Sequence, residues 1–471
     1  MKINCVYDFT TPIGYIPNGF PLEEIELLSK YNYDINNSDF VDEFYKNRTL
    51  NVKSSLIMSG IRNADISTND LELIDDYVIN KDELFIYNIC SSGDIFSTLS
   101  LIHNSKYPHV LSYVSDKIKK LLNTSKNLYI VIEYIMEGQI DMNVIDSIYL
   151  HCKFNDIPPD KVIFITSVFN IAELHSKYCN IYSQKAKIKV ASYNWSLPFK
   201  AHELEHMLGK KNSDMNIFLK NSINMSLHSN IRSKKALLLN RRLRLHRIIL
   251  LSLLVHDDFI DKIMSSFDLT MDSFPNFYDW IDGEYFQNTK KFYDNKLIKK
   301  SKNGYLKLKE IGKQTLDYDN LHEVVGYGFE SSKLYSDTYF SIVTETQFFE
   351  NQQFISEKSI KPLMQLHPFI IVGSPYTLKN LKSYGFKTFD KWWDESYDIM
   401  ENTNDRLIQV YKIIKLLLDK SDEEWISMLN EMKSILVHNR NVLLQYNYEN
   451  VSKIVLDNFK EVIFNNKQIL F

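Results

Sequence analysis

The chain has 471 residues, of which 44% are hydrophobic and 24% charged, and it carries a formal net charge of −4. This length is too great for one ordinary core and predicts two domains of roughly 200 residues each, while the composition excludes wholesale disorder. The small negative net charge argues against a protein dominated by binding to nucleic-acid backbones, although it leaves room for a local basic patch.

Signals for a compartment or a membrane are few. Cys5, Cys90, Cys152 and Cys179 form no CxxC pair, so we expect reduced thiols in a cytoplasmic compartment. The first residues contain no apolar run of signal-peptide length. The longest apolar run, residues 248–255, is too short for a bilayer, so the sequence predicts no membrane span.

The first predicted domain is an α/β domain at residues 1–207. Four short apolar runs alternate with helical patterns, at residues 83–89, 128–134, 161–167 and 187–192. Strands that are apolar on both faces and separated by helices predict a parallel sheet with helices on both sides.

Three carboxylates follow two of these predicted strands. Asp94 comes after the first run, and Glu133 and Glu137 lie at the end of the second. Because ligands of open α/β sheets bind at the carboxyl ends of strands, each is a candidate general base. Each, taken singly, is more often a surface or capping carboxylate, and the sequence does not choose among them.

The segment HELEH, residues 202–206, has the spacing of a zinc-peptidase helix. His202 and His206 would share one helical face, and Glu203 could polarise a metal-bound water. Position 212, where an extended form of this motif supplies a third ligand, is Asn, a poor zinc ligand. We interpret the spacing as accidental and predict no metal site, and we keep a zinc metallohydrolase as an alternative.

A second α/β domain is predicted at residues 235–400, after a polar connection at residues 208–234. Its expected strands lie at residues 236–240, 339–344 and 368–373. Ser374 and Pro375 are expected to open a helix that Gly385 ends. Residues 401–471 have helical apolar spacing and predict three C-terminal helices that pack across the domains.

A lysine-rich stretch lies between these strands, at Lys290 to Lys309. It contains eight lysines with Phe292, Tyr293 and Tyr305 between them. Such a mixture can bind single-stranded nucleic acid or another polyanion, although a solvated helix face is the commoner explanation. A non-catalytic polyanion-binding protein is therefore a further alternative, and nucleic acid is a partner that we do not favour.

The densest polar signal lies at residues 344–375. Thr344 and Glu345 end a predicted strand, and Gly373 and Ser374 form a turn that permits close approach of a ligand. Four residues fall in the first turns of the intervening helix: Ser356, Glu357, Lys358 and Lys361. A helix N-terminus with two lysines favours phosphate oxygens, and a carboxylate there could accept from ribose hydroxyls.

The segment FISEK, residues 354–358, followed by a Pro, an apolar strand and a glycine, resembles the donor-binding motif of the family 10 glycosyltransferases, the fucosyltransferases. It is also similar to bacterial and phage glycosyltransferase-like proteins with an FISEKxxKP pattern and an upstream NRR motif, matched here by Asn240, Arg241 and Arg242 with Arg247 following. The resemblance covers residues 236–390. It implies the GT-B architecture, in which two Rossmann-like domains face a cleft.

The resemblance also implies roles for single residues. Glu357 would contact the donor ribose, Lys358 the diphosphate, and Arg241 or Arg242 the same phosphates. The spacing from Glu345 to Glu357 is longer than in the family, so the donor sugar stays open. The expected function is transfer of a sugar from a nucleoside-diphosphate sugar to a hydroxyl of a glycan or other acceptor, which could be anionic. No cofactor is required, because fixed cations can replace a metal at the leaving diphosphate.

Overall fold

The computed structural model describes residues 3–7, 71–73, 84–90, 109–135, 140–208, 230–240, 244–269, 295–316, 332–348, 352–447, 450–451 and 461–462. The chain forms two compact units, one of Met1–Trp195 with Tyr448–Phe471 and one of Ser196–Asn447. The sequence analysis instead places boundaries near residues 207, 235 and 401. The second unit includes the helix that carries HELEH because that helix packs against helices of this unit.

The first unit contains a six-stranded parallel sheet with the order β2-β1-β3-β4-β5-β6. Its strands are β1 (Ile3–Tyr7), β2 (Leu71–Leu73), β3 (Leu84–Cys90), β4 (Leu128–Tyr134), β5 (Val162–Thr166) and β6 (Lys189–Ser192). Its helices are η2 (Val110–Tyr113), α5 (Asp116–Thr124), α6 (Met142–Phe154), η3 (Pro159–Lys161) and α7 (Ile171–Ile181). The predicted parallel sheet of this unit is confirmed.

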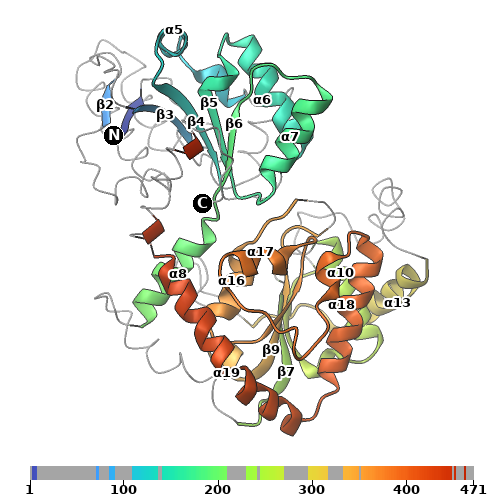
Figure 1. Cartoon of the computed structure of the whole chain (residues 1–471). Helices are drawn as coiled ribbons and strands as arrows, with labels where there is room; N and C mark the ends of the chain where they lie inside the picture. The colour runs from blue at the N-terminus through green and yellow to red at the C-terminus, as the bar shows by residue number, and fades with distance from the viewer. Residues whose placement is uncertain are drawn as a thin grey trace, which may run out of the picture. The chain divides into compact units, whose positions relative to one another are not determined.

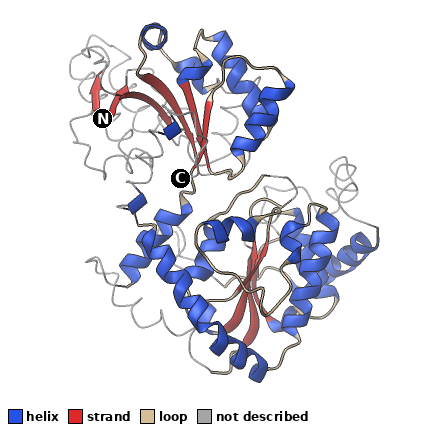
Figure 2. Cartoon of the chain, viewed as in Figure 1, coloured by secondary structure: helices blue, strands red, loops and turns tan. Residues whose placement is uncertain are grey.

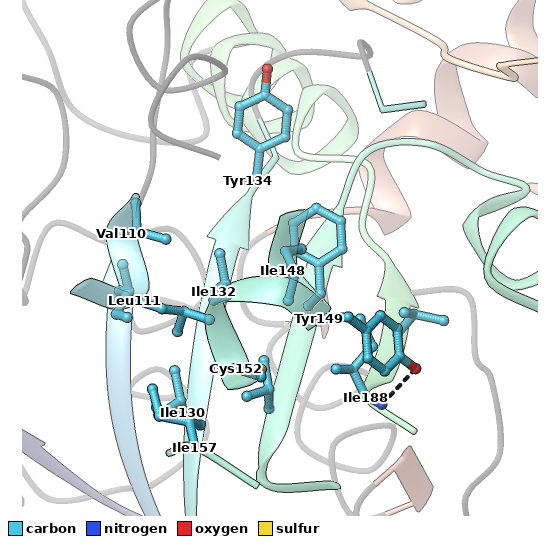
Figure 3. Close-up of a cluster of buried hydrophobic side chains, with 14 of the residues drawn as sticks. Val110, Leu111, Ile130, Ile132, Tyr134, Ile148, Tyr149, Cys152, Ile157 and Ile188 are labelled. Carbon is cyan, nitrogen blue, oxygen red and sulfur yellow. Dashed lines mark hydrogen bonds between the residues drawn. The ribbon is translucent and has the colours of Figure 1, made fainter. Parts of the chain in front are cut away.

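The core of the first unit lies between the sheet and its helices. Figure 3 shows Ile130 and Ile132 of β4 beside Ile148 and Cys152 of α6, all of them buried. The backbone N–H of Ile188 donates to the Tyr149 hydroxyl at 3.1 Å, so the polar tip of a buried ring is satisfied.

The second unit contains a four-stranded parallel sheet with the order β10-β9-β7-β8. Its strands are β7 (Lys234–Asn240), β8 (Ile263–Phe267), β9 (Thr338–Thr344) and β10 (Phe369–Val372). Its helices are α8 (Ser196–Met207), α10 (Leu245–His256), η5 (Ile260–Lys262), α13 (Asn295–Ile311), α15 (Ser332–Ser336), α16 (Glu357–Met364), α17 (Thr377–Ser383), η6 (Ser396–Ile399), α18 (Thr403–Leu418) and α19 (Asp422–Gln445).

Helices cover both faces of this second sheet. Figure 1 shows α16 and α19 on one side of β7 and β9, with α10 and α18 on the other. Figure 2 shows the two sheets of the chain as separate groups of strands, each with its own helices. Trp425 of α19 is fully buried and stacks on Tyr339 and Phe340 of β9. The α/β class of the chain is therefore confirmed.

Some sequence expectations need correction. Ser374 does not cap α17, because that helix begins at Thr377, and its first backbone N–H groups donate to the Asp398 carboxylate. Strand β8 was missed, because IMSSF is short and two of its five residues are serines. Two of the three predicted C-terminal helices correspond to α18 and α19, and the third lies largely outside the described residues. Within the described residues, no helix is long and apolar enough to span a bilayer.

Candidate functional site

The second sheet reverses its order between β7 and β9. The chain passes from β7 to β8 on one side and then to β9 and β10 on the other. In parallel α/β sheets the crevice at such a reversal, outside the carboxyl ends of the strands, is the usual place for a ligand. Here those carboxyl ends are Asn240 and Thr344, two of the residues that the sequence analysis selected.

Asn240 and Thr344 form a buried polar pair across the two strands. The Thr344 hydroxyl donates to the Asn240 side-chain oxygen, and both residues are at most 1% exposed. The Asn240 side-chain nitrogen has no hydrogen-bond partner among the residues that the structure describes. A buried amide donor without a partner is costly, so a ligand oxygen at this edge would remove that cost. Arg241 and Arg242, which follow directly, lie outside the described residues.

Glu345 ties the end of β9 to the start of α16. Its carboxylate accepts from the Thr346 and Ser356 backbone N–H groups at 3.1 and 3.0 Å, from the Ser356 hydroxyl at 2.6 Å, and from the Ser359 hydroxyl. It is 0% exposed. Both carboxylate oxygens of Glu345 are therefore hydrogen-bonded within the protein, and they join the end of β9 to the start of α16.

Arg247 and His246, in the first turn of α10, bind the carbonyl groups at the same strand end. Arg247 donates to the carbonyl oxygens of Thr344 and Glu345 at 3.0 and 3.1 Å. The His246 Nε2 lies 3.0 Å from the Glu345 carbonyl oxygen. Burial, followed by the charge of Arg247, holds the pKa of His246 well below its usual value, so this histidine is a neutral donor.

Arg406 of α18 fixes the loops around this edge. It donates to the carbonyl oxygens of Gly373 at 3.2 Å and of Phe348, and its guanidinium lies over the Phe348 ring. A Cβ added at Gly373 would lie 3.4 Å from the Glu345 side chain and 3.1 Å from the Thr377 hydroxyl. A side chain at position 373 would therefore press against the side chains of Glu345 and Thr377. The buried Ser374 hydroxyl has no partner within the described residues.

Glu357 and Lys358 form an ion pair at the first turn of α16. Their charged atoms are 2.6 Å apart, and the two side chains are 28% and 32% exposed. Desolvation alone would raise the pKa of Glu357, but Lys358 and then Lys361 outweigh it and lower the pKa to about 2. Glu357 is therefore an anion at neutral pH, beside two partly exposed lysines.

The backbone at this helix start is already hydrogen-bonded. The Lys358 N–H donates to the Ser356 hydroxyl at 3.3 Å, and the Ser359 N–H donates to the Ser356 carbonyl oxygen at 3.2 Å. Ser356 is therefore an N-cap, as its sequence position also allows. A phosphate at this place would be bound by the side chains of Lys358 and Lys361 and not by the helix N–H groups.

The HELEH segment lies on α8. Glu203, which would have to polarise a zinc-bound water, is buried and paired with Lys200 at 2.6 Å. Within the described residues, no group of three or more His, Cys, Asp or Glu side chains could hold a metal ion. The side chain of His206 lies outside the described part of the chain.

The lysine-rich stretch corresponds in part to α13. Lys300 and Lys307 pair with Asp257 and Asp258 at 3.5 and 3.0 Å, and Tyr305 is buried. Residues 290–294 lie outside the described residues. One face of α13 is buried, and Lys300 and Lys307 form ion pairs with nearby carboxylates.

In the first unit, Glu133 lies near the carboxyl end of β4. It is 1% exposed and pairs in register with Cys90 of β3 and Ile165 of β5. Asp94 and Glu137 lie outside the described residues. The first sheet also reverses its order, between β1 and β3.

Sequence reasoning missed Arg406 and Lys200, two buried cations beside the site. Arg406 occupies the apolar stripe of α18 that Val410 and Ile413 continue. A charged residue in an apolar stripe is a detectable signal, because a buried cation needs specific partners. Lys200 precedes Glu203 by three residues, a spacing that places the two on one helical face.

Comparisons with known proteins identify no family for this chain. No protein-family model matches it, and no curated protein matches it. Among solved structures it is similar to the N-terminal domain of Candida albicans trehalose-6-phosphate phosphatase, with 10% identity and a TM-score of 0.40 over 81% of this chain and 71% of that one. A likeness at this level reflects α/β character and carries no argument about function.

Proposed function

We propose that this chain is a glycosyltransferase that binds a nucleoside-diphosphate sugar at the carboxyl edge of its second sheet. The observation that carries the proposal is that α16 begins beside the order reversal of that sheet, fixed there by Glu345. Glu357, Lys358 and Lys361 lie on the first turns of α16. The FISEK resemblance selects the same residues for donor binding.

The chemistry follows from the charges at this edge. Lys358 and Lys361 would bind the diphosphate, and the anionic Glu357 would accept from ribose hydroxyls. When the bond at the anomeric carbon breaks, negative charge develops on the leaving diphosphate, and fixed cations stabilise it there. The acceptor hydroxyl would be deprotonated by a carboxylate of the first unit, for which Asp94 and Glu133 are candidates in a GT-B arrangement.

A thermal-shift screen against UDP, GDP, ADP, CMP and their sugars tests the proposal. A ligand that binds only the folded state stabilises it by about 2.7 kcal/mol at a hundred times its Kd, so modest affinity is visible. We expect a selective shift with one nucleotide and its sugar, and none with the others. Zinc quantification on the same sample tests the metallohydrolase alternative.

Two substitutions locate the binding. Lys358→Ala should weaken nucleotide affinity about tenfold to a hundredfold, because it removes a charge-assisted contact. Lys412→Ala, at an exposed position of α18, should leave the affinity unchanged. No shift with any nucleotide, together with about one zinc per chain, would reject the transferase and favour the hydrolase. Polyanion binding that falls steeply with salt, without turnover, would favour the non-catalytic alternative.

A further inference from the structure

The start of α10 lies at the same strand end as the amide of Asn240. Strand β7 ends at Asn240, and α10 begins at Leu245. The Thr344 hydroxyl donates to the Asn240 side-chain oxygen, and Arg247 in the first turn of α10 donates to the Thr344 carbonyl oxygen at 3.0 Å. Asn240 and the first turn of α10 therefore both contact Thr344, the last residue of β9.

The amide of Asn240 carries a hydrogen-bond donor that the described residues do not use. Asn240 is 0% exposed, and its side-chain nitrogen has no partner among them. Because Thr344 already donates to the amide oxygen, the NH₂ group is the part of the side chain that can bind a ligand, and it can bind only an acceptor atom. A buried donor without an acceptor destabilises a fold, so an acceptor atom of a ligand would stabilise this one.

The start of α10 carries positive charge. Its N-cap residue is Arg244, whose side chain makes no capping hydrogen bond, and its first turn contains no acidic residue. The start of α16 differs, because the Ser356 hydroxyl caps it. Burial, followed by the charge of Arg244, lowers the pKa of Arg247 to about 10, so this buried guanidinium keeps its charge at neutral pH. A helix N-terminus and a guanidinium both favour an anion.

We propose that the Asn240 amide and the start of α10 form a binding site for a phosphate group. Phosphate oxygens supply both the acceptor that the amide requires and the negative charge that the helix start favours. The assignment of this group to the diphosphate of a sugar donor rests on the proposed function. Lys358 and Lys361 would contact the same diphosphate from α16, whose start Glu345 joins to the end of β9.

The test uses inorganic pyrophosphate as the probe, because it carries phosphate groups without a base or a sugar. In Asn240→Leu/Thr344→Val, both polar groups of the pair are replaced by apolar groups of similar size, a change that is often neutral or stabilising. Asn240→Asp, which keeps an acceptor for Thr344 but removes the donor, serves if the apolar variant does not fold. Lys412→Ala, at an exposed position of α18, is the control. Affinity is measured by calorimetry on the full-length chain, and stability by urea unfolding.

We expect the double variant to be at least as stable as the wild-type protein and to bind pyrophosphate about tenfold to a hundredfold more weakly, because a charge-assisted hydrogen bond is lost. A pair with only a structural role would instead lower the stability on removal and leave the affinity of the folded protein unchanged. Wild-type affinity in a stable variant would therefore overturn the inference and leave the proposed function intact.

Two further outcomes separate the phosphate site from the proposed function. Weaker pyrophosphate binding by the variants, together with no binding of any nucleotide by the wild-type protein, would support the phosphate site and reject the transferase. A wild-type protein that binds neither pyrophosphate nor a nucleotide would overturn both.

Discussion

Two carboxylates at the candidate site have opposite environments. Glu345 is enclosed and accepts four hydrogen bonds from neighbouring residues, whereas Glu357 is partly exposed and balanced by lysines. A carboxylate whose lone pairs are already used cannot also bind a ligand strongly. In the proposed donor site, Glu345 would therefore order the start of α16 and Glu357 would contact the ligand.

Glu345→Gln should destabilise the protein by about 2–4 kcal/mol. The NH₂ group of the new side chain would face the N–H and O–H donors of Ser356 and Ser359, which now bind the carboxylate. Urea unfolding measures this change. Glu310→Gln, on an exposed part of α13, is the matched control and should change stability by about 0.5 kcal/mol or less. Equal stabilities of the two variants would show that the Glu345 hydrogen bonds contribute little.

The depressed pKa of Glu357 predicts a specific pH dependence. The pKa of Glu357 is about 2 in the folded protein, against a reference value of 4.5. Its contribution to the free energy of unfolding is therefore complete above pH 4.5 and is lost as the pH falls toward 2. Because the side chain is 28% exposed, we expect a contribution of only about 1–2 kcal/mol. The stability difference between wild type and Glu357→Gln should be constant from pH 5 to 8 and shrink below pH 4.5. A difference that grows in acid would contradict this assignment.

At the scale of elements, α13 approaches α10 unusually closely. A Cβ added at Gly304 would lie 1.8 Å from the Ser252 carbonyl oxygen, which is backbone and cannot move aside. Gly304→Ala should therefore cost about 3 kcal/mol in the free energy of unfolding, despite the better helix propensity of Ala. Asn303→Ala, one residue earlier on an exposed face, should be neutral or slightly stabilising. Similar stabilities for both variants would show that α13 does not pack as described.

The elements also show how far sequence reasoning extends. Strands β4, β5, β9 and β10 were predictable because each is a largely apolar run, as expected for parallel strands covered on both sides. Strand β8 was not, since only its position beside β7 shows that it is a strand. The start of α17 was misassigned because Asp398, twenty residues later in the chain, caps it.

The candidate site was also only partly predictable from the sequence. Ser356, Glu357 and Lys358 form a local motif, and their sequence alone placed them at a helix start. The partners of Glu345 are also near in sequence. Its burial, however, depends on Gly373, which lies beside its side chain, and on α16, which supplies Ser359. The contacts of Arg406 with Gly373 and Phe348 depend on tertiary packing, which no local pattern contains.

At the scale of the whole chain, the two sheets share one strand order. Each places its second strand on one side of the first and its later strands on the other. Both sheets therefore contain an order reversal, the usual place for a ligand. In the second unit, the strands at the reversal end in the polar residues Asn240 and Thr344. In the first unit, Asp94 follows β3 in the sequence. We propose that the nucleotide binds at the order reversal of the second sheet and not at that of the first.

Hydrogen exchange with and without nucleotide tests this proposal. The nucleotide identified by the thermal-shift screen should slow exchange at the end of β7, at residues 344–346 and in the first turns of α16. Such protection arises because binding suppresses local opening of the segments that contact the ligand. Peptides from β5 and α7 of the first unit should exchange at the same rate in both samples. Protection confined to the first unit would place the nucleotide at the other sheet and reject the assignment of Glu357 and Lys358 to donor binding.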